Sequence, residues 1–266
     1  MDDLPESSSK GTKRRRMDDS AADAATSSSL QDDLTFSDTL VALQIMRAQF
    51  PDIDKVSVQP FILKSQLYSS VKDRTQVDRE LESLRRDKVL RIFKLNTGQD
   101  DYAIMFLDDY IKQIDQVFKR MEGKKEMEYE VFGWFKNYVL DLKLETGIEH
   151  QELCSLLSLG GKVKDSHITL LINAGVIIRQ LIDPNMYWFA IPNVGTLLKG
   201  LAQGRNELIS LLSRRRYKEM MLATLEKKRL RMSPLDMRFH LRDLIGSGHL
   251  RTDHTPTGLI IRVSKD

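Results

Sequence analysis

Residues 75–107 read TQVDRELESLRRDKVLRIFKLNTGQDDYAIMFL. Apolar residues recur at helical spacing through the first half, behind the capping-box-like start Thr75-Gln76-Val77-Asp78. The second half predicts a hairpin, with a strand at 89–95, a polar turn and a returning strand at 102–107. The stretch therefore predicts a helix that runs directly into a two-stranded antiparallel sheet.

Two more helices are predicted upstream of this stretch, at 34–50, where Pro51 ends the helix, and at 61–71. Three helices followed by a hairpin is the element order of a winged helix, a variant of the helix-turn-helix. The predicted fold class is therefore mainly α with small β-hairpins, that is, α+β.

The same order is predicted twice more along the chain. The second copy has helices at 131–144, 149–157 and 166–173 and strands at 176–182 and 187–191. The third copy has helices at 194–212 and 217–225, a helix that opens at Ser233-Pro234, and strands at 249–252 and 259–263. The helix at 194–212 would end the second copy and begin the third.

A short signature marks the end of each third helix. It reads Leu84-x-x-x-Lys88-x-Leu90, Leu171-x-x-x-Gly175-x-Ile177 and Leu244-x-x-x-Gly248-x-Leu250. The pattern is a core leucine, a residue that can end the helix, and an inward-facing strand residue. We therefore expect three tandem winged-helix domains, at 31–122, 123–197 and 198–266, after a tail at 1–30.

Positive charge gathers in the stretch from Gly204 to Met232, GRNELISLLSRRRYKEMMLATLEKKRLRM. It has nine Lys or Arg between Arg205 and Arg231, against three acids, Glu207, Glu219 and Glu226. Apolar residues at helical spacing predict helix buried on one face, with a cationic ridge outside. Residues 199–266 hold 15 basic and 7 acidic residues, whereas the whole chain has a net charge of only +3. This asymmetry indicates a polyanionic partner such as nucleic acid or a membrane surface.

The tail at 1–30 is rich in Ser, Asp and Ala and nearly free of large apolar residues, so we expect it to be disordered. Its cluster Lys13, Arg14, Arg15 and Arg16 is typical of a nuclear localisation signal, and an incidental basic patch is the alternative. The single cysteine excludes a disulfide framework and suits a reducing compartment. No apolar run is long enough for a membrane span, and we expect no membrane contact.

The sequence lacks the residue patterns of catalysis. Its glycines lack the spacing of a phosphate-binding loop, and the protein-kinase signatures are absent. His240, His249 and His254 lack the spacing of a zinc site, and Cys154 is expected to be a core thiol. Trp134 and Trp188 are expected to pack in the core. We therefore expect no enzyme, no cofactor, no metal and no small-molecule substrate.

In a winged helix the third helix usually enters the major groove of DNA. In the first copy acids cancel most of the basic charge of this helix, and in the second the helix is nearly apolar, HITLLIN. In the third copy Arg238 and Arg242 share one helical face and follow the ridge. A set of Arg and Lys without base-reading Asn or Gln predicts phosphate contacts. The candidate DNA-binding residues are Arg214, Arg215, Arg216, Lys218, Arg229, Arg238 and Arg242.

Three long runs of this sequence resemble the serine/threonine-protein kinase 19 family, also called winged helix repair protein 1. They are ILKSQLYSSVKDRTQVDRELESLRRDKVLRI (62–92), HITLLINAGVIIRQ (167–180), and the run from WFAIPNVG (188–195) through GRNELISLLSRRRYKEMML (204–222). The resemblance covers roughly residues 34–266 in order. It places the family's basic, DNA-facing positions at Arg214, Arg216 and Lys218, whereas the other four candidates come from charge and spacing alone.

The resemblance implies a nuclear scaffold of three winged helices that binds double-stranded DNA and acts on chromatin in transcription-coupled nucleotide excision repair. It implies contacts with stalled RNA polymerase II, the Cockayne-syndrome ubiquitin-ligase assembly and the general transcription factor TFIIH. Two alternatives stay open. One is a module that binds only proteins, motivated by the apolar third helix of the second copy. The other is the protein kinase of the family's name, which no residue here supports.

Overall fold

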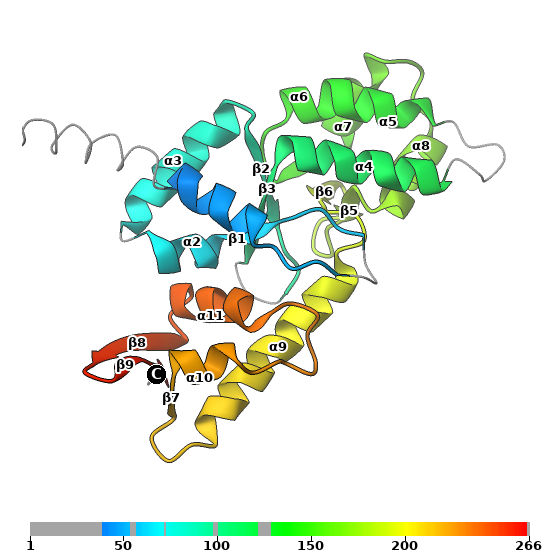
Figure 1. Ribbon diagram of the computed structural model, residues 1–266. Helices are drawn as coiled ribbons and strands as arrows, with labels where there is room; N and C mark the ends of the chain where they lie inside the picture. The colour runs from blue at the N-terminus through cyan, green and yellow to red at the C-terminus, as the bar shows by residue number, and fades with distance from the viewer. Residues whose placement is uncertain (1–38, 54–56, 72, 98–100, 122–128, 265–266) are drawn as a thin grey trace, which may run out of the picture. The chain divides into compact units, whose positions relative to one another are not determined.

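The computed structural model describes residues 39–53, 57–71, 73–97, 101–121 and 129–264 (Figure 1). They form helices and three small antiparallel sheets, so the fold is α+β as expected. The basic cluster Lys13 to Arg16 and Lys265 lie outside the described residues. None of the described helices is both long enough and apolar enough to cross a membrane.

The first sheet follows a helix at residues 39–48. Its elements are β1 (Ile62–Leu63), α2 (Lys64–Ser70), α3 (Arg74–Arg86), β2 (Leu90–Lys94) and β3 (Tyr102–Phe106). The strand order is β1-β3-β2, with both neighbours antiparallel to β3. The hairpin expected at 89–107 is therefore confirmed, and it gains a third strand from the chain just before α2.

The second sheet follows a long helix that the sequence analysis missed, α4 (Leu107–Met121). The elements after it are α5 (Glu130–Trp134), a π-helical turn η1 (Phe135–Val139), α6 (Leu140–Leu142), β4 (Gly147–Glu149), α7 (His150–Ser158), α8 (Asp165–Ala174), β5 (Ile177–Arg179) and β6 (Met186–Phe189). The strand order is β4-β6-β5. The helix predicted at 131–144 thus exists, although one turn of it is π-helical.

The third sheet follows α9 (Gly195–Ser213). Its elements are β7 (Glu219–Met221), α10 (Leu222–Glu226), α11 (Met237–Gly246), β8 (Leu250–Thr255) and β9 (Gly258–Val263), and the strand order is β7-β9-β8. The same connectivity therefore occurs three times: a short strand, two helices and a hairpin whose second strand lies in the centre of the sheet.

The helix-to-strand exits follow the predicted signature. The residue that ends each helix has a left-handed backbone, with φ of 57° at Lys88, 72° at Gly175 and 85° at Gly248. The Val89 amide donates to the Leu84 carbonyl and the Val176 amide to the Leu171 carbonyl, which closes the last turn in the Schellman pattern. Lys88 adopts this conformation without being glycine, which costs backbone energy.

Several predicted helix starts are wrong. The helices expected from residues 61 and 217 each begin instead with a short strand, β1 or β7, because these residues pair with the central strand of their sheet. Helix α3 is capped by Asp73, whose carboxylate accepts from the amides of Thr75 and Gln76. Helix α11 begins at Met237, capped by Asp236, and not at Ser233-Pro234.

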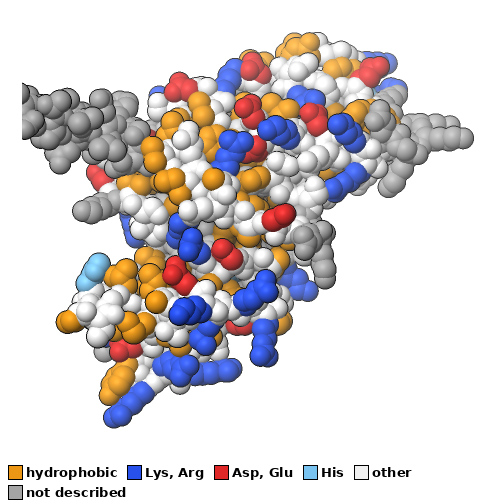
Figure 2. Space-filling view, in the orientation of Figure 1, with side chains coloured by type: hydrophobic (Ala, Val, Ile, Leu, Met, Phe, Trp, Pro, Cys, Tyr) orange, Lys and Arg blue, Asp and Glu red, His pale blue; other side chains and the backbone are white. Residues whose placement is uncertain are grey.

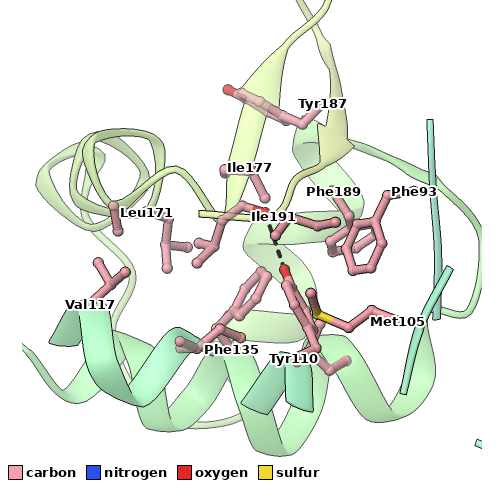
Figure 3. Close-up of a cluster of buried hydrophobic side chains, with 14 of the residues drawn as sticks. Phe93, Met105, Tyr110, Val117, Phe135, Leu171, Ile177, Tyr187, Phe189 and Ile191 are labelled. Carbon is pink, nitrogen blue, oxygen red and sulfur yellow. Dashed lines mark hydrogen bonds between the residues drawn. The ribbon is translucent and has the colours of Figure 1, made fainter. Parts of the chain in front are cut away.

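The first sheet is covered on both faces. Along β3, Ala103 and Met105 belong to one apolar cluster, while Ile104 and Phe106 belong to another. The first cluster also contains side chains of the second sheet and its helices, as Figure 3 shows around Tyr110. The Tyr110 hydroxyl donates to the carbonyl of Ala190, the residue that follows β6, at 3.1 Å. The unbroken apolar run of β3 therefore reflects a strand buried on both sides.

Helix α9 connects two cores, as the sequence analysis expected. Leu197 and Leu201 in its first half pack in the large cluster shared by the first two sheets. Leu208 and Leu212 in its second half pack in the cluster of the third sheet. One helix therefore ends the second repeat of elements and begins the third.

Helix α11 packs directly on α2 of the first repeat. A Cβ added to Gly246 would lie 1.6 Å from the Ser65 carbonyl oxygen, so only glycine allows this approach. The Gln66 side-chain amide donates to the Phe239 carbonyl at 3.1 Å, and Phe239 stacks edge-on with Phe50 and Phe61. The third helix of the third repeat is therefore a packing element.

Arg205 connects the same two parts electrostatically. Its guanidinium donates to Asp243 of α11 at 2.6 Å and to Asp101, just before β3, at 2.7 Å. The Asp243 side chain is completely buried, and Ser65 donates to it at 2.6 Å. Burial alone would lower the pKa of Arg205, but hydrogen bonds to Asp243 and then Asp101 raise it above its ordinary value. The expectation that Arg205 belongs to the exposed ridge is wrong.

His240 lies beside this network and is fully buried. Its Nε2 lies 2.9 Å from the Ser233 hydroxyl, and its ring fills the space where a side chain at position 204 would be. Burial lowers the pKa of His240 to about 4, against the opposing attraction of Asp243. The imidazole is therefore neutral in the folded chain at neutral pH.

Replacing Arg205 by Ala should lower the free energy of unfolding by about 3–5 kcal/mol, because it leaves the buried Asp243 carboxylate without its cation. The matched Arg216→Ala change removes an exposed arginine and should alter stability by no more than about 0.5 kcal/mol. Urea unfolding measures both values. Similar stabilities for the two variants would contradict the assigned role of Arg205.

Stability should also fall as the pH drops from about 6.5 to about 4. In that window the unfolded chain binds a proton at His240 that the folded chain does not, so unfolding becomes easier by up to about 3 kcal/mol. His240→Gln keeps a donor near Ser233 but cannot titrate. Urea unfolding of the parent chain and of the His240→Gln variant at several pH values gives the two profiles of stability against pH. If His240 were protonated in the folded state, these two profiles would not differ across this window.

Candidate nucleic-acid interface

The cationic stretch 204–232 is not one helix. Helix α9 ends at Ser213, residues 214–218 form a turn, and β7 and α10 follow. The Arg215 amide donates to Leu212 and the Lys218 amide to Arg215, and Lys218 has a left-handed φ of 53°. Pairing of β7 with β9 overrides the local helical preference. The positive charge therefore lies on a turn and a loop.

The turn after α9 presents its basic side chains to solvent. Arg214, Arg215, Arg216 and Lys218 are all exposed, and in the described part of the chain none of them forms an ion pair. The Arg216 guanidinium lies 5.2 Å from the centroid of the exposed Tyr217 ring. We name Arg214, Arg215, Arg216 and Lys218 the basic turn. A polyanion could therefore bind these charges without displacing an ion pair among the described residues.

A groove extends from the basic turn along α9. Its volume is about 1040 Å³, and its opposite wall is the loop that follows α10. The charged residues that line it are Arg214, Arg215, Lys228, Arg229, Arg231 and Glu207. On the face shown in Figure 2, Lys and Arg side chains gather over the end of α9 and this loop. Five cations and one acid thus line a single open groove.

Glu207 holds the loop in place. Its carboxylate accepts from the backbone amides of Arg231 and Met232, each at 3.0 Å. The bond from the Arg231 amide is the largest influence on the pKa of Glu207 and lowers it. The one acid of the groove therefore already accepts hydrogen bonds, and it holds the cationic loop against α9, next to the basic turn. The sequence indicates only a negative charge at Glu207, because nothing local marks its distant backbone partners.

Arg238 and Arg242 do not line this groove. Arg238 is 54% exposed and lies 3.7 Å from Glu226, in a neighbouring recess that also contains Lys228 and Arg229. Arg242 is half-buried and donates to the Gln49 side chain at 2.7 Å, and its burial lowers its pKa. Both side chains belong to α11, which also packs on α2 of the first repeat.

The wing formed by β8 and β9 adds little free charge. Arg262 donates to Glu219 at 2.5 and 2.8 Å and also lies 3.4 Å from Asp253. Arg251 on β8 is exposed. The basic turn and the loop therefore carry most of the unpaired charge of the third repeat.

The corresponding helices of the first two repeats are less suited to a polyanion. Arg85 and Arg86 of α3 pair with Glu82, and Lys88 pairs with Asp141. Helix α8 buries Ile168, Leu170, Leu171 and other side chains against its own repeat. The charge cancellation that the sequence predicted on α3 is confirmed. The apolar face of α8 is used within the chain.

The residues weighed for catalysis are accounted for by packing and local bonds. Cys154 is partly buried, which raises the pKa of its thiol, and His249 contacts the Ser247 hydroxyl at 2.9 Å. Trp134 covers Gly160 and Gly161, where any Cβ would clash with its ring. Within the ranges that the structure describes, no group of three or more His, Cys, Asp or Glu side chains could hold a metal ion.

Comparison with known proteins points to one family. The family described as inactive serine-threonine protein kinase 19 matches residues 28–263. Winged helix repair factor 1 of Homo sapiens is 29% identical over 208 residues, 78% of each chain. The protein of that name in Xenopus laevis is 29% identical over 245 residues, covering 91% of this chain and 90% of the relative.

A further relative is similar over most of this chain. Winged helix repair factor 1 of Dictyostelium discoideum is 26% identical over 263 residues, 86% of this chain and 65% of the relative. The family match includes all three sheets and the whole basic groove. The resemblance expected from the sequence is confirmed, and the chain belongs to the family described as inactive serine-threonine protein kinase 19.

Proposed function

We propose that this chain is a non-enzymatic scaffold of three tandem winged helices that binds double-stranded DNA in the nucleus during repair. The observation that carries the proposal is the groove lined by five Lys and Arg side chains, two from the basic turn and three from the loop after α10. Such a groove suits the closely spaced phosphates of a duplex. The repair role is supported by the printed name of the relatives, winged helix repair factor 1.

The threefold recurrence of one strand connectivity supports three winged helices, at about 31–122, 123–197 and 198–266. These domains share more than a linker. Helix α9 contributes to two cores, and α11 packs on α2. We therefore expect the domains to act as one rigid scaffold.

The duplex would be held by its phosphates. Helix α11, the counterpart of a recognition helix, is pressed against α2 and presents only Arg238 and the engaged Arg242. The basic turn and the groove offer Arg and Lys, whose contacts with phosphate carry no sequence information. We therefore expect high salt sensitivity and little preference for sequence.

The proposed partners are RNA polymerase II, the Cockayne-syndrome ubiquitin-ligase assembly and TFIIH, met during transcription-coupled nucleotide excision repair on chromatin. The cluster Lys13 to Arg16 would direct the chain to the nucleus. In this proposal the third winged helix holds DNA and the other two dock proteins.

The alternative of a module that binds only proteins now rests on one feature, the basic groove. The apolar face of α8, which motivated it, packs inside its own repeat. An acidic protein surface on the basic groove is the version that stays open. For the kinase alternative, the family to which the chain belongs is described as inactive.

Replacing Arg214, Arg215 and Arg216 together by Glu should abolish duplex binding at moderate salt. Each lost phosphate contact should also reduce the slope of log affinity against log salt by about 0.9. The measurement is fluorescence anisotropy with a labelled duplex at several salt concentrations.

The matched control for this change is the triple replacement of Lys119, Arg120 and Lys162 by Glu, which alters net charge equally at exposed sites outside the third repeat. The control should keep its affinity. Equal losses in both triple variants would show that only net charge matters, and full binding by the first variant would refute the proposed DNA site.

Two changes at Glu207 separate its charge from its bonds to the loop. Glu207→Gln removes the negative charge but keeps an acceptor for the Arg231 amide, so duplex affinity should hold or rise. Glu207→Ala removes the acceptor, frees the loop and should weaken binding about fivefold, despite the loss of a negative charge. Tighter binding by the Ala variant than by the Gln variant would contradict a positioning role for Glu207.

A further inference from the structure

Leu181 and Ile182 lie at the tip of the β5–β6 hairpin. They are 94% and 99% exposed, more than any other large apolar side chain in the described chain. Two adjacent aliphatic side chains that are exposed to solvent contribute nothing to the core. Single exposed apolar residues are common on protein surfaces, but two neighbouring ones exposed to this degree are unusual.

The residues on either side of the hairpin tip form hydrogen bonds that do not involve these two side chains. The Gln180 amide donates to the Met186 carbonyl at 2.9 Å, and the Asn185 amide donates to the Asp183 carboxylate at 2.9 Å. The His150 amide donates to the Asn185 carbonyl at 2.7 Å, which ties the tip to α7. The backbone therefore presents Leu181 and Ile182 on a fixed support, with part of the entropic cost of binding already met by folding.

A recess of about 260 Å³ lies beside the tip. Leu95 and Asn96 of the first repeat and Ile178 and Trp188 of the second line it, together with Leu181 and Ile182. Trp188 is only partly buried. The recess is large enough for one apolar side chain and is continuous with the exposed pair.

Two cations border the recess. The Lys94 ammonium lies 5.3 Å from the centroid of the Trp188 ring, and the exposed Arg179 guanidinium lies 5.8 Å from that of Tyr187. The Asp183 carboxylate, at the hairpin turn, accepts from the backbone amide of Asn185. We name Leu181, Ile182, Trp188, Lys94 and Arg179 the wing patch. It combines an apolar centre with a positively charged rim.

We propose that the wing patch binds an acidic peptide segment of another protein, with an aromatic or aliphatic side chain of that segment in the recess. The apolar centre would supply the contact area, and the exposed Arg179 at the edge of the recess would select a carboxylate on the partner. A nucleic acid fits less well, because Leu181 and Ile182 offer no flat face on which a base could stack, and the Lys94 ammonium already lies over the Trp188 ring. The patch is built from the first two repeats and does not depend on the DNA groove of the third.

The test is selection of random peptides of roughly twelve residues, displayed on phage, against the full chain, with removal of binders to the Leu181→Asp, Ile182→Asp double variant. Both positions are almost fully exposed, so this variant should unfold at the temperature of the parent. Enriched peptides should combine Asp or Glu with an aromatic or aliphatic anchor. Their affinity, measured by fluorescence anisotropy, should fall at least about tenfold in the double variant.

Two further variants define the outcome. Arg179→Glu should also weaken the selected peptides about tenfold and reduce their salt sensitivity, whereas Leu159→Asp, at an exposed leucine outside the patch, should not. Peptides without acidic residues, or peptides that bind the double variant as well as the parent, would overturn the proposal. So would a short single-stranded oligonucleotide that bound the parent and lost affinity in the double variant, since the patch would then be a nucleic-acid surface.

Discussion

The ion pair of Arg205 with Asp243 and Asp101 is the constraint on which the arrangement of the chain depends. Asp243 is completely buried, and its partners are Arg205 from α9 and Ser65 from α2. A carboxylate in that position without its cation would cost several kcal/mol, so α9, α11 and the hairpin of the first sheet must meet at one point. Gly246 then allows α11 to approach α2 closely enough for those bonds to form.

This packing explains why positive charge lies where it does. A helix pressed against α2 cannot also enter a DNA groove, and α11 accordingly carries few free cations. The unpaired Arg and Lys side chains lie instead on the basic turn and on the loop that Glu207 holds against α9. The chain thus keeps the element order of a helix-turn-helix fold, while its basic groove lies away from the helix that usually contacts DNA.

Much of the fold could be predicted from local sequence, because local chemistry decides it. Lys88, Gly175 and Gly248 end their helices in the left-handed conformation that the signature requires. Strands of two or three residues, such as β1, could not be found, since pairing with a distant strand creates them. For the same reason Arg205 was taken for an exposed charge and Glu207 for a counter-charge: each is defined by partners far along the chain. The groove itself needs α9 and a loop fourteen or more residues later to come together.

The three hairpins differ at their turns, which indicates that the three repeats have different uses. In the first, Asp101 beside the turn is fixed by Arg205. In the third, the turn is polar, with Thr255 bonded to Thr257 and to the Gly258 carbonyl. A polar turn is therefore sufficient to close this kind of hairpin. The exposed Leu181 and Ile182 of the second hairpin are not needed to close the turn or to fill the core. The proposed partner, which would cover this apolar pair, accounts for their exposure to solvent.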